Sequence, residues 1–136
     1  RDRATIEKIA GTYVEKNPAT KCSLVAPALI VACGRTGVSG CYGGKNLTKF
    51  NEWFMFDLGL AVQNLCLKAH ELGLGSVVVG LLDHDRAKAI LELPADREVV
   101  ACIPVGHPAV AGKEGPPRKP LSEFAFIDAH GKPFPG

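Results

Sequence analysis

The order of hydrophobic and polar positions in the first third of the chain predicts a helix, a strand and a loop. Thr5–Glu15 carries apolar residues at helical spacing, and Asn17-Pro18 is expected to end this helix because the residue before proline avoids the helical region. Leu24–Cys33 is a continuous apolar run that predicts a buried strand, with Pro27 at its start or at an edge. The glycine-rich stretch Gly34–Lys49 predicts a loop.

Phe50–Leu72 predicts the longest element, a helix without proline that ends at Gly73, a residue typical of a helix C-terminus. Apolar residues surround almost the whole axis, and the polar residues fall on one narrow stripe. That stripe holds Asp57, Asn64, Lys68 and Glu71. One side of such a helix can face its own sheet, whereas the other needs a partner, so the pattern favours an obligate oligomer. The alternative is a central helix enclosed within a monomer.

The middle of the chain predicts two more strands with a short helix between them. Ser76–Leu82 is rich in β-branched residues and predicts a strand, in which Gly80 marks a bulge or the close approach of a ligand to the backbone. Asp83–Leu93 predicts a short helix that begins after Asp83 as its N-cap. Glu98–Val105 predicts the third strand.

The last segment, Ala109–Gly136, is rich in proline and glycine and predicts an extended tail. Within it, Leu121–Ile127 is expected to add an edge strand or to wrap around a partner. The alternation of helices and strands predicts an α+β fold, an α/β sandwich in which helices flank a small central sheet. We expect one domain over residues 1–136, with residues 109–136 as its tail.

Charge and hydropathy argue against two kinds of partner. Lys and Arg number 16 against 14 Asp and Glu, a net charge of +2, which gives no basic face for nucleic acid. The apolar run Phe50–Leu67 is broken by polar residues, so we expect no membrane span. The chain begins with Arg1 and its only methionine is Met55, from which we expect the natural polypeptide to have further residues before Arg1.

Metal and thiol chemistry find little support in the sequence. The 5 cysteines include no pair at Cys-x-x-Cys spacing, and the 4 histidines share no ligand spacing, so we expect no metal site. Free thiols of this kind favour a reducing cytoplasmic location and a structural role. Cys41 is the exception because it lies on the predicted loop, which leaves a thiol-based redox protein as one alternative.

Two features suggest the binding of a flat, phosphorylated ligand. Val77–Leu82 offers strand amides beside Gly80, a geometry suited to the edge of a heteroaromatic ring. Arg118-Lys119 follows a stiff Pro116-Pro117 pair and is suited to a phosphate, although basic pairs in tails are usually solvated. We find no pair of residues placed for acid–base or nucleophilic catalysis and therefore predict no catalytic side chain.

Three blocks of sequence resemble the nitroreductase family of FMN-dependent oxidoreductases. They run from Asp57 to Gly80 (DLGLAVQNLCLKAHELGLGSVVVG), from Leu93 to Pro108 (LPADREVVACIPVGHP) and from Arg118 to Leu121 (RKPL). The resemblance implies a homodimer built on the long helix, FMN at the interface, and hydride transfer from NAD(P)H to a nitroaromatic, quinone or similar small-molecule acceptor. In such enzymes the flavin carries the chemistry and the protein supplies binding and electrostatics.

The resemblance also implies which residues bind the cofactor. The flavin ring would lie along Val79, Gly80 and Leu81. The flavin phosphate would be held by Arg118 and Lys119. The ribityl chain and ring would be reached by Asn17 and Lys21. The Arg-rich segment with which family members begin does not occur in this sequence, which leaves a second alternative, a flavin-deficient dimeric binding or structural module on the same fold.

Overall fold

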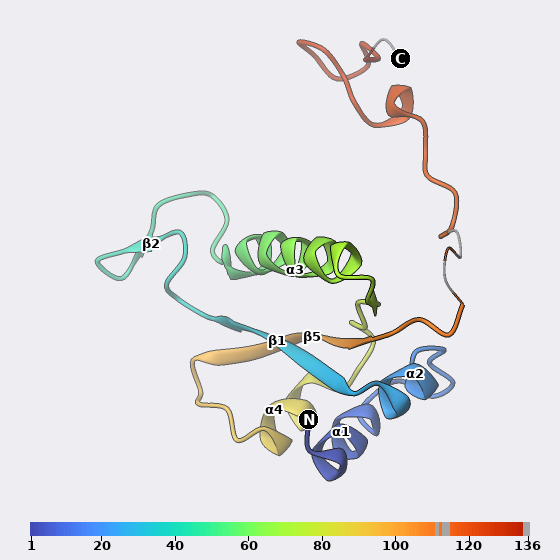
Figure 1. Cartoon of the computed structure of the whole chain (residues 1–136). Helices are drawn as coiled ribbons and strands as arrows, with labels where there is room; N and C mark the ends of the chain where they lie inside the picture. Colours follow the sequence, from blue (N-terminus) through green and yellow to red (C-terminus); the bar gives the residue numbers. More distant parts are fainter. Residues whose placement is uncertain (111, 113–114, 135–136) are drawn as a thin grey trace.

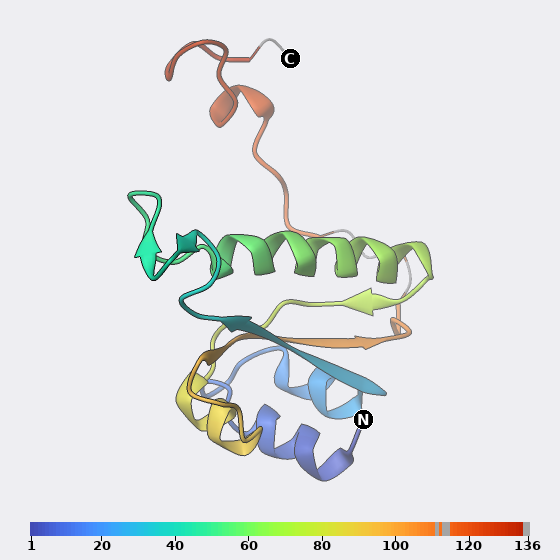
Figure 2. The ribbon, with the colours of Figure 1, turned by 90° about the vertical axis from the view of Figure 1, so that its left-hand side faces the viewer.

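The computed structural model describes residues 1–110, 112 and 115–134. A small antiparallel sheet forms the middle layer, with one long helix on one face and three shorter helices on the other (Figures 1 and 2). The helices are α1 Arg3–Ala10, α2 Thr20–Val25, α3 Phe54–Glu71 and α4 His84–Ile90, with a 3-10 turn η1 at Leu121–Glu123. The strands are β1 Ala28–Arg35, β2 Cys41–Tyr42, β3 Lys45–Asn46, β4 Gly75–Ser76 and β5 Arg97–Gly106. The predicted α+β fold class is thus confirmed.

The sheet has the strand order β1-β5-β4, and both strand pairs are antiparallel. β1 pairs with β5 from Ala28 opposite Val105 to Arg35 opposite Arg97, with one irregularity between Ala32 and Cys33. β5 is therefore the central strand, and its residues include the most buried of the molecule, among them Ile103 at 0% exposure. The strand predicted at Glu98–Val105 is confirmed.

The main core lies between the sheet and the layer of α1, α2 and α4. Ile6, Ile9 and Ala10 form the buried face of α1, which begins at its N-cap Asp2. Ala87 of α4 is fully buried beneath the sheet. The carboxylate of Asp83 accepts a hydrogen bond from the Arg86 amide at 3.0 Å, so the predicted N-cap is confirmed.

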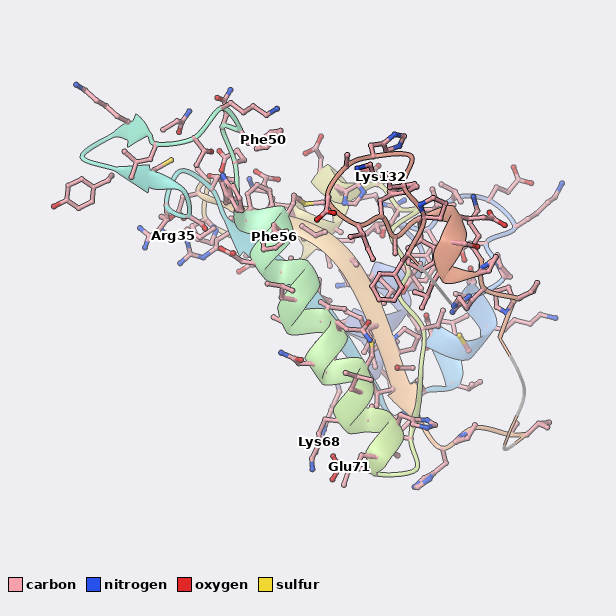
Figure 3. The ribbon with its side chains drawn as sticks, turned by 90° about the horizontal axis from the view of Figure 1, so that it is seen from above. Arg35, Phe50, Phe56, Lys68, Glu71 and Lys132 are labelled. Atoms are coloured by element: carbon pink, nitrogen blue, oxygen red, sulfur yellow. The ribbon has the colours of Figure 1, made fainter. Side chains whose placement is uncertain are left out.

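α3 ends in a Schellman motif. Gly73 has a φ of +72°, its amide donates to the His70 carbonyl, and the Leu74 amide donates to the Ala69 carbonyl. Ala69, at 6% exposure, is the only buried residue of α3. Figure 3 views the helix from its outer side, where the described chain places no other element over it. The outward apolar side chains, each more than half exposed, are Met55, Phe56, Leu60 and Leu67.

Two sequence predictions near the first strand need correction. The first helix ends at Ala10, and the residues that follow form turns up to Ala19, with one β-bridge from Tyr13 to Leu82. Leu24 and Val25 close the short helix α2 instead of starting a strand, because a brief apolar run fits either structure. Ala26 is the residue before Pro27 and has left the helical region, with ψ of 139°, so β1 begins directly after Pro27 as expected.

The predicted loop Gly34–Lys49 contains the two-stranded hairpin β2–β3. Gly43 and Gly44 form its turn with positive φ angles of 56° and 75°, a conformation that favours glycine and suits a two-residue hairpin. The loop prediction was therefore wrong at this hairpin. Alternating apolar residues, the usual sign of a strand, do not mark its two short strands.

The strand predicted at Ser76–Leu82 is paired only in part. β4 covers Gly75–Ser76, and Val79 adds a single bridge to Cys102. In the same register Val77 lies opposite Pro104, which has no N–H to donate, so the ladder is interrupted there. The segment consequently leaves the sheet edge with part of its backbone unpaired.

The tail lies away from the sheet, on the same side as α3 (Figures 1 and 2). Within its described residues, Leu121–Glu123 forms η1 and Phe126 pairs with Pro133 in one bridge. The described residues of Leu121–Ile127 thus add no strand to the main sheet. Residues 111, 113–114 and 135–136 of the predicted tail lie outside the described residues.

Candidate functional site

A pocket of about 380 Å³ lies between two segments that are mostly neither helix nor strand. One wall is the turn Val14–Ala19, which connects α1 to α2, and the other is Val77–Leu81 at the sheet edge. The structure thereby brings Asn17 next to Val79, Gly80 and Leu81, as the sequence-based site required. Lys21 is exposed on α2 and is not among the residues that line this pocket.

Backbone hydrogen bonds hold the Val79–Asp83 segment at both ends. Val79 and Cys102 exchange two bonds of 2.9 Å, and the Asp83 amide donates to the Thr12 carbonyl at 2.7 Å. Between them, the Val14 amide donates to the Leu81 carbonyl at 3.1 Å. The segment is therefore fixed against both β5 and the turn after α1.

The amides of Gly80 and Leu81 remain open in this braced segment. Neither donates a hydrogen bond to another described residue. The Val79 amide, in contrast, is already engaged by Cys102, so it has no proton to offer a ligand in this arrangement. A Cβ added at Gly80 would meet nothing within 4 Å, so its backbone faces free space. Of the strand amides that the sequence suggested, that of Val79 is engaged, whereas those of Gly80 and Leu81 are available as donors at the pocket.

Apolar side chains accompany these donors. Val78 is 53% exposed and Leu81 68% exposed, whereas Val79 is 4% exposed and points into the core. Exposed aliphatic groups beside free N–H donors can bind a flat ligand that has an apolar face and an edge of hydrogen-bond acceptors. This combination is the main chemical property of the pocket.

Asn17 is engaged with its own chain on both sides of its carboxamide. Its Oδ1 accepts a hydrogen bond from the Ala19 amide at 2.9 Å, and its Nδ2 donates to the Leu81 carbonyl at 3.3 Å. The neighbouring turn residues Val14, Glu15 and Lys16 also line the pocket, although the sequence did not predict them as site residues. Gly11 and the Asn17-Pro18 pair were the available signs that the chain turns here.

Arg118 and Lys119 lie on the tail and do not line the pocket. Arg118 donates from Nη1 to the Pro116 carbonyl at 3.0 Å, and Lys119 forms an exposed ion pair of 3.5 Å with Glu123. The structure of this one chain thus keeps the predicted phosphate-binding pair apart from the predicted ring-binding segment.

A second pocket of about 320 Å³ adjoins the first at Val77, which lines both. Its walls include Cys22 and Val25 of α2 and the segment Gly106–Ala109, where β5 ends and the tail begins. The tail therefore starts at one end of the two neighbouring pockets.

A buried polar group lies behind Val79. The Tyr13 hydroxyl and Ser23 Oγ are 3.1 Å apart, and both residues are buried. Burial raises the pKa of Tyr13 to about 12 and the pKa of the Cys102 thiol to about 11. Both groups are therefore neutral at pH 7, which suits a structural role better than proton transfer.

The remaining candidates carry little chemistry. Cys41 is half-buried in the hairpin and its thiol donates to Asn46 Oδ1 at 2.9 Å. Among the described residues, no group of three or more acidic, histidine or cysteine side chains is placed to hold a metal ion. Helices long and apolar enough to cross a membrane are likewise not found in the described part of the chain.

Comparison with known proteins gives one consistent result. A family model described as the nitroreductase family matches residues 17–107. A protein of Methanothermobacter thermautotrophicus, provisionally named an NADH dehydrogenase/NAD(P)H nitroreductase, is 34% identical over 113 residues. The match covers 80% of this chain and 52% of that protein, so the chain spans about half the length of this curated relative.

Solved structures agree with the sequence comparison. A nitroreductase family protein from Clostridium novyi NT superposes with a TM-score of 0.68 at 25% identity, covering 98% of this chain and 69% of that one. A structure described as an oxidoreductase containing FMN superposes with a TM-score of 0.72 at 24% identity, covering 91% of this chain and 65% of that one. The second likeness shows a shared fold only.

Proposed function

Since this chain belongs to the nitroreductase family, we propose that it forms part of an FMN-dependent oxidoreductase that transfers hydride from NAD(P)H to nitroaromatic, quinone or similar acceptors. The observation that carries the proposal is the pair of open amides at Gly80 and Leu81, beside the exposed side chain of Val78. The name of the archaeal relative supports the nicotinamide donor. The cofactor follows from the resemblance to the family and from the chemistry of the pocket.

The residues of the pocket fit the ring of a flavin. An isoalloxazine ring is flat, has large apolar faces and carries nitrogen and oxygen acceptors along one edge. The exposed side chains of Val78 and Leu81 offer apolar contacts, while the Gly80 and Leu81 amides offer donors. The free space in front of Gly80 leaves room for such an edge to approach the backbone.

The phosphate end of the cofactor would require the tail to move or a second chain to contribute. The second pocket continues from Val77 toward Gly106–Ala109, and the tail that begins there carries Arg118 and Lys119. Both cations are exposed, and their contacts are a local carbonyl bond and a surface ion pair, which cost little to break. We propose that these two side chains bind the phosphate once the tail is held against the protein body.

When bound, FMN supplies the hydride-transfer chemistry, and the chain's own residues bind and orient it. The Gly80 and Leu81 amides would stabilise negative charge that develops at the ring edge, because preorganised donors need no rearrangement during reaction. Val78 and Leu81 would exclude water from the ring face.

We also propose a homodimer built on α3. The exposed apolar side chains of α3, Met55, Phe56, Leu60 and Leu67, support this, because proteins rarely leave a large apolar patch uncovered. A second copy of the chain would cover these side chains. The free cysteines agree with a reducing cytoplasmic location, which we include in the proposal.

An absorbance spectrum of the purified protein, recorded with the intact mass, tests the proposed function. We expect flavin bands, and FMN released on denaturation. In Gly80→Val, the new side chain would occupy the space before the amides, so FMN affinity should fall at least about tenfold. Its unfolding midpoint should stay close to that of the wild type, because a Cβ at this position has open space around it. A colourless dimer that takes up no added FMN would instead support the flavin-deficient module.

A further inference from the structure

We infer that Pro104 is a positioning residue, which keeps the Val77 carbonyl free to accept a hydrogen bond from the ribityl chain of the flavin. Pro104 lies in β5, and its missing N–H leaves the ladder to β4 open where the two pockets meet. The inference rests on the proposed function, because the ligand is the flavin. Neither Pro104 nor Val77 belongs to the cofactor-binding residues that the family resemblance implies.

The ladder keeps one register on both sides of its gap. β4 begins with Gly75 opposite Gly106, and the isolated bridge further along joins Val79 to Cys102. Each step forward along one segment is matched by one step back along the other, so no residue is inserted or skipped between the two pairs. The gap is therefore not a β-bulge, and its cause lies in the residues that face each other inside it.

Pro104 occupies the position at which a donor is missing. Val79 and Cys102 exchange two hydrogen bonds and are thus a hydrogen-bonded pair. Such pairs alternate along an antiparallel ladder, so Val77 and the residue at position 104 would form the next one. An N–H at position 104 would donate to the Val77 carbonyl, and proline has none. Neither the amide nor the carbonyl of Val77 forms a hydrogen bond with another described residue.

The other side of β5 is not disturbed by the proline. β1 runs past it without interruption, with Leu29 opposite Pro104 and Ile30 opposite Ile103. A proline fits inside a sheet only where its nitrogen needs no partner, and here that side faces Val77. Pro104 therefore opens one ladder and leaves the other closed.

The gap lies between the two ends of the proposed cofactor site. Val77 lines both pockets, and Pro104 lines the second one. With the ring at Gly80 and the phosphate at the tail that begins beyond Gly106, the ribityl chain has to pass Val77. Its hydroxyl groups are hydrogen-bond donors, and the Val77 carbonyl is an acceptor that no described residue engages.

Pro104→Ala and Pro104→Val test the inference as a pair. Both supply an N–H at position 104, but alanine is smaller than proline and valine is larger. An effect that the two variants share therefore comes from the N–H and not from a change of packing volume. In the ligand-free protein, hydrogen exchange at the Val77 amide should be fast in the wild type and at least about tenfold slower in both variants, because a closed pair also engages that amide.

Three flavins then locate the effect along the ligand. FMN has the ring, the ribityl chain and the phosphate, riboflavin lacks the phosphate, and lumiflavin lacks both the chain and the phosphate. We expect both variants to bind FMN and riboflavin about fivefold more weakly, the usual effect of one lost neutral hydrogen bond, and to bind lumiflavin as the wild type does. In the wild type itself, riboflavin should shift the carbonyl carbon resonance of Val77 more than lumiflavin does. A proline with only a structural role would not separate riboflavin from lumiflavin.

Four results would overturn the inference. A Val77 amide that is already protected in the wild type would show that the ladder is not open. Unchanged riboflavin affinity in variants that do protect this amide would show that the ligand does not use the Val77 carbonyl. An equal loss for all three flavins would assign the change to the ring, and opposite effects of the two variants would attribute it to volume. If the wild type binds none of the flavins, the proposed function fails and the inference fails with it, whereas the other results leave the proposed function standing.

Discussion

Gly34 of β1 leaves its side-chain position to the ring of Phe54, the first residue of α3. A Cβ built on Gly34 would overlap Cδ2 of that ring and press against Cγ and Cε2. The first residue of the long helix can therefore pack directly on β1 because Gly34 has no Cβ. This contact links the layer that faces outward to the strand that flanks the core.

Gly34→Ala should therefore lower the free energy of unfolding by about 2 kcal/mol, the usual cost of overpacking a site that cannot expand. Urea unfolding measures the change. The double variant Gly34→Ala/Phe54→Leu should recover part of the loss, because a smaller side chain makes room for the methyl group. Strictly additive effects of the two substitutions would contradict the proposed overlap.

Gly73 ends α3 with a φ of +72°, where a residue with a Cβ is strained. Gly73→Ala is expected to lower stability by about 1 kcal/mol. Gly73→Asn should cost less, since asparagine adopts the left-handed conformation more readily. Thermal unfolding of both variants tests the ranking. Equal losses would show that the backbone conformation at Gly73 does not limit stability.

Because Tyr13 and Cys102 are buried, the free energy of unfolding should fall as the pH becomes alkaline. Their pKa values are about 12 and 11 in the folded protein, against 10.0 and 9.0 for exposed groups. Both groups lose a proton to become negatively charged. Because their pKa values are lower in the unfolded chain, the unfolded chain ionises first as the pH rises. Their contribution is complete below pH 9 and is lost between about pH 9 and pH 12.

Urea unfolding midpoints at pH 8 and pH 11 should therefore differ, and the loss should be smaller in Tyr13→Phe. Tyr42→Phe is the matched control, because Tyr42 is the other tyrosine of the chain and is 79% exposed. It should keep most of the wild-type loss. An identical pH dependence in wild type and Tyr13→Phe would show that Tyr13 does not contribute to it.

The outer face of α3 should control the oligomeric state. Leu60→Glu or Leu67→Glu places a charge among the exposed apolar side chains, so sedimentation should change from dimer to monomer at micromolar concentration. Leu47→Glu is the control, since Leu47 is also more than half exposed but lies after the hairpin β2–β3. A wild-type chain that sediments as a stable monomer would contradict the dimer proposal.

Single residues in the sequence correctly predicted where several helices and strands begin or end. Asp83 caps α4, Gly73 ends α3, and Pro27 fixes the start of β1, because each acts on its own neighbouring backbone. Helical spacing also placed the apolar face of α1 correctly, at Ile6, Ile9 and Ala10. The resemblance to the nitroreductase family is confirmed by the family match over residues 17–107, which includes the first block and nearly all of the second.

Contacts between residues far apart in the chain decided two features that the local sequence did not predict. Val77 would continue β4, but it falls opposite Pro104 on a strand almost thirty residues away, and the ladder breaks there. Leu24 and Val25 read equally well as strand or helix until their packing is known. Neither outcome follows from residues within one local window, because each depends on a partner distant in sequence.

The sequence by itself determined the composition of the pocket: glycine, small aliphatic residues, and an asparagine before a proline. Only the tertiary structure decided which atoms remain available in it. Val79 gives its amide to Cys102, Gly80 and Leu81 keep theirs free, and Asn17 turns to Leu81. The physical reason is that a backbone donor is open or occupied according to what lies opposite it, and that is set by the fold.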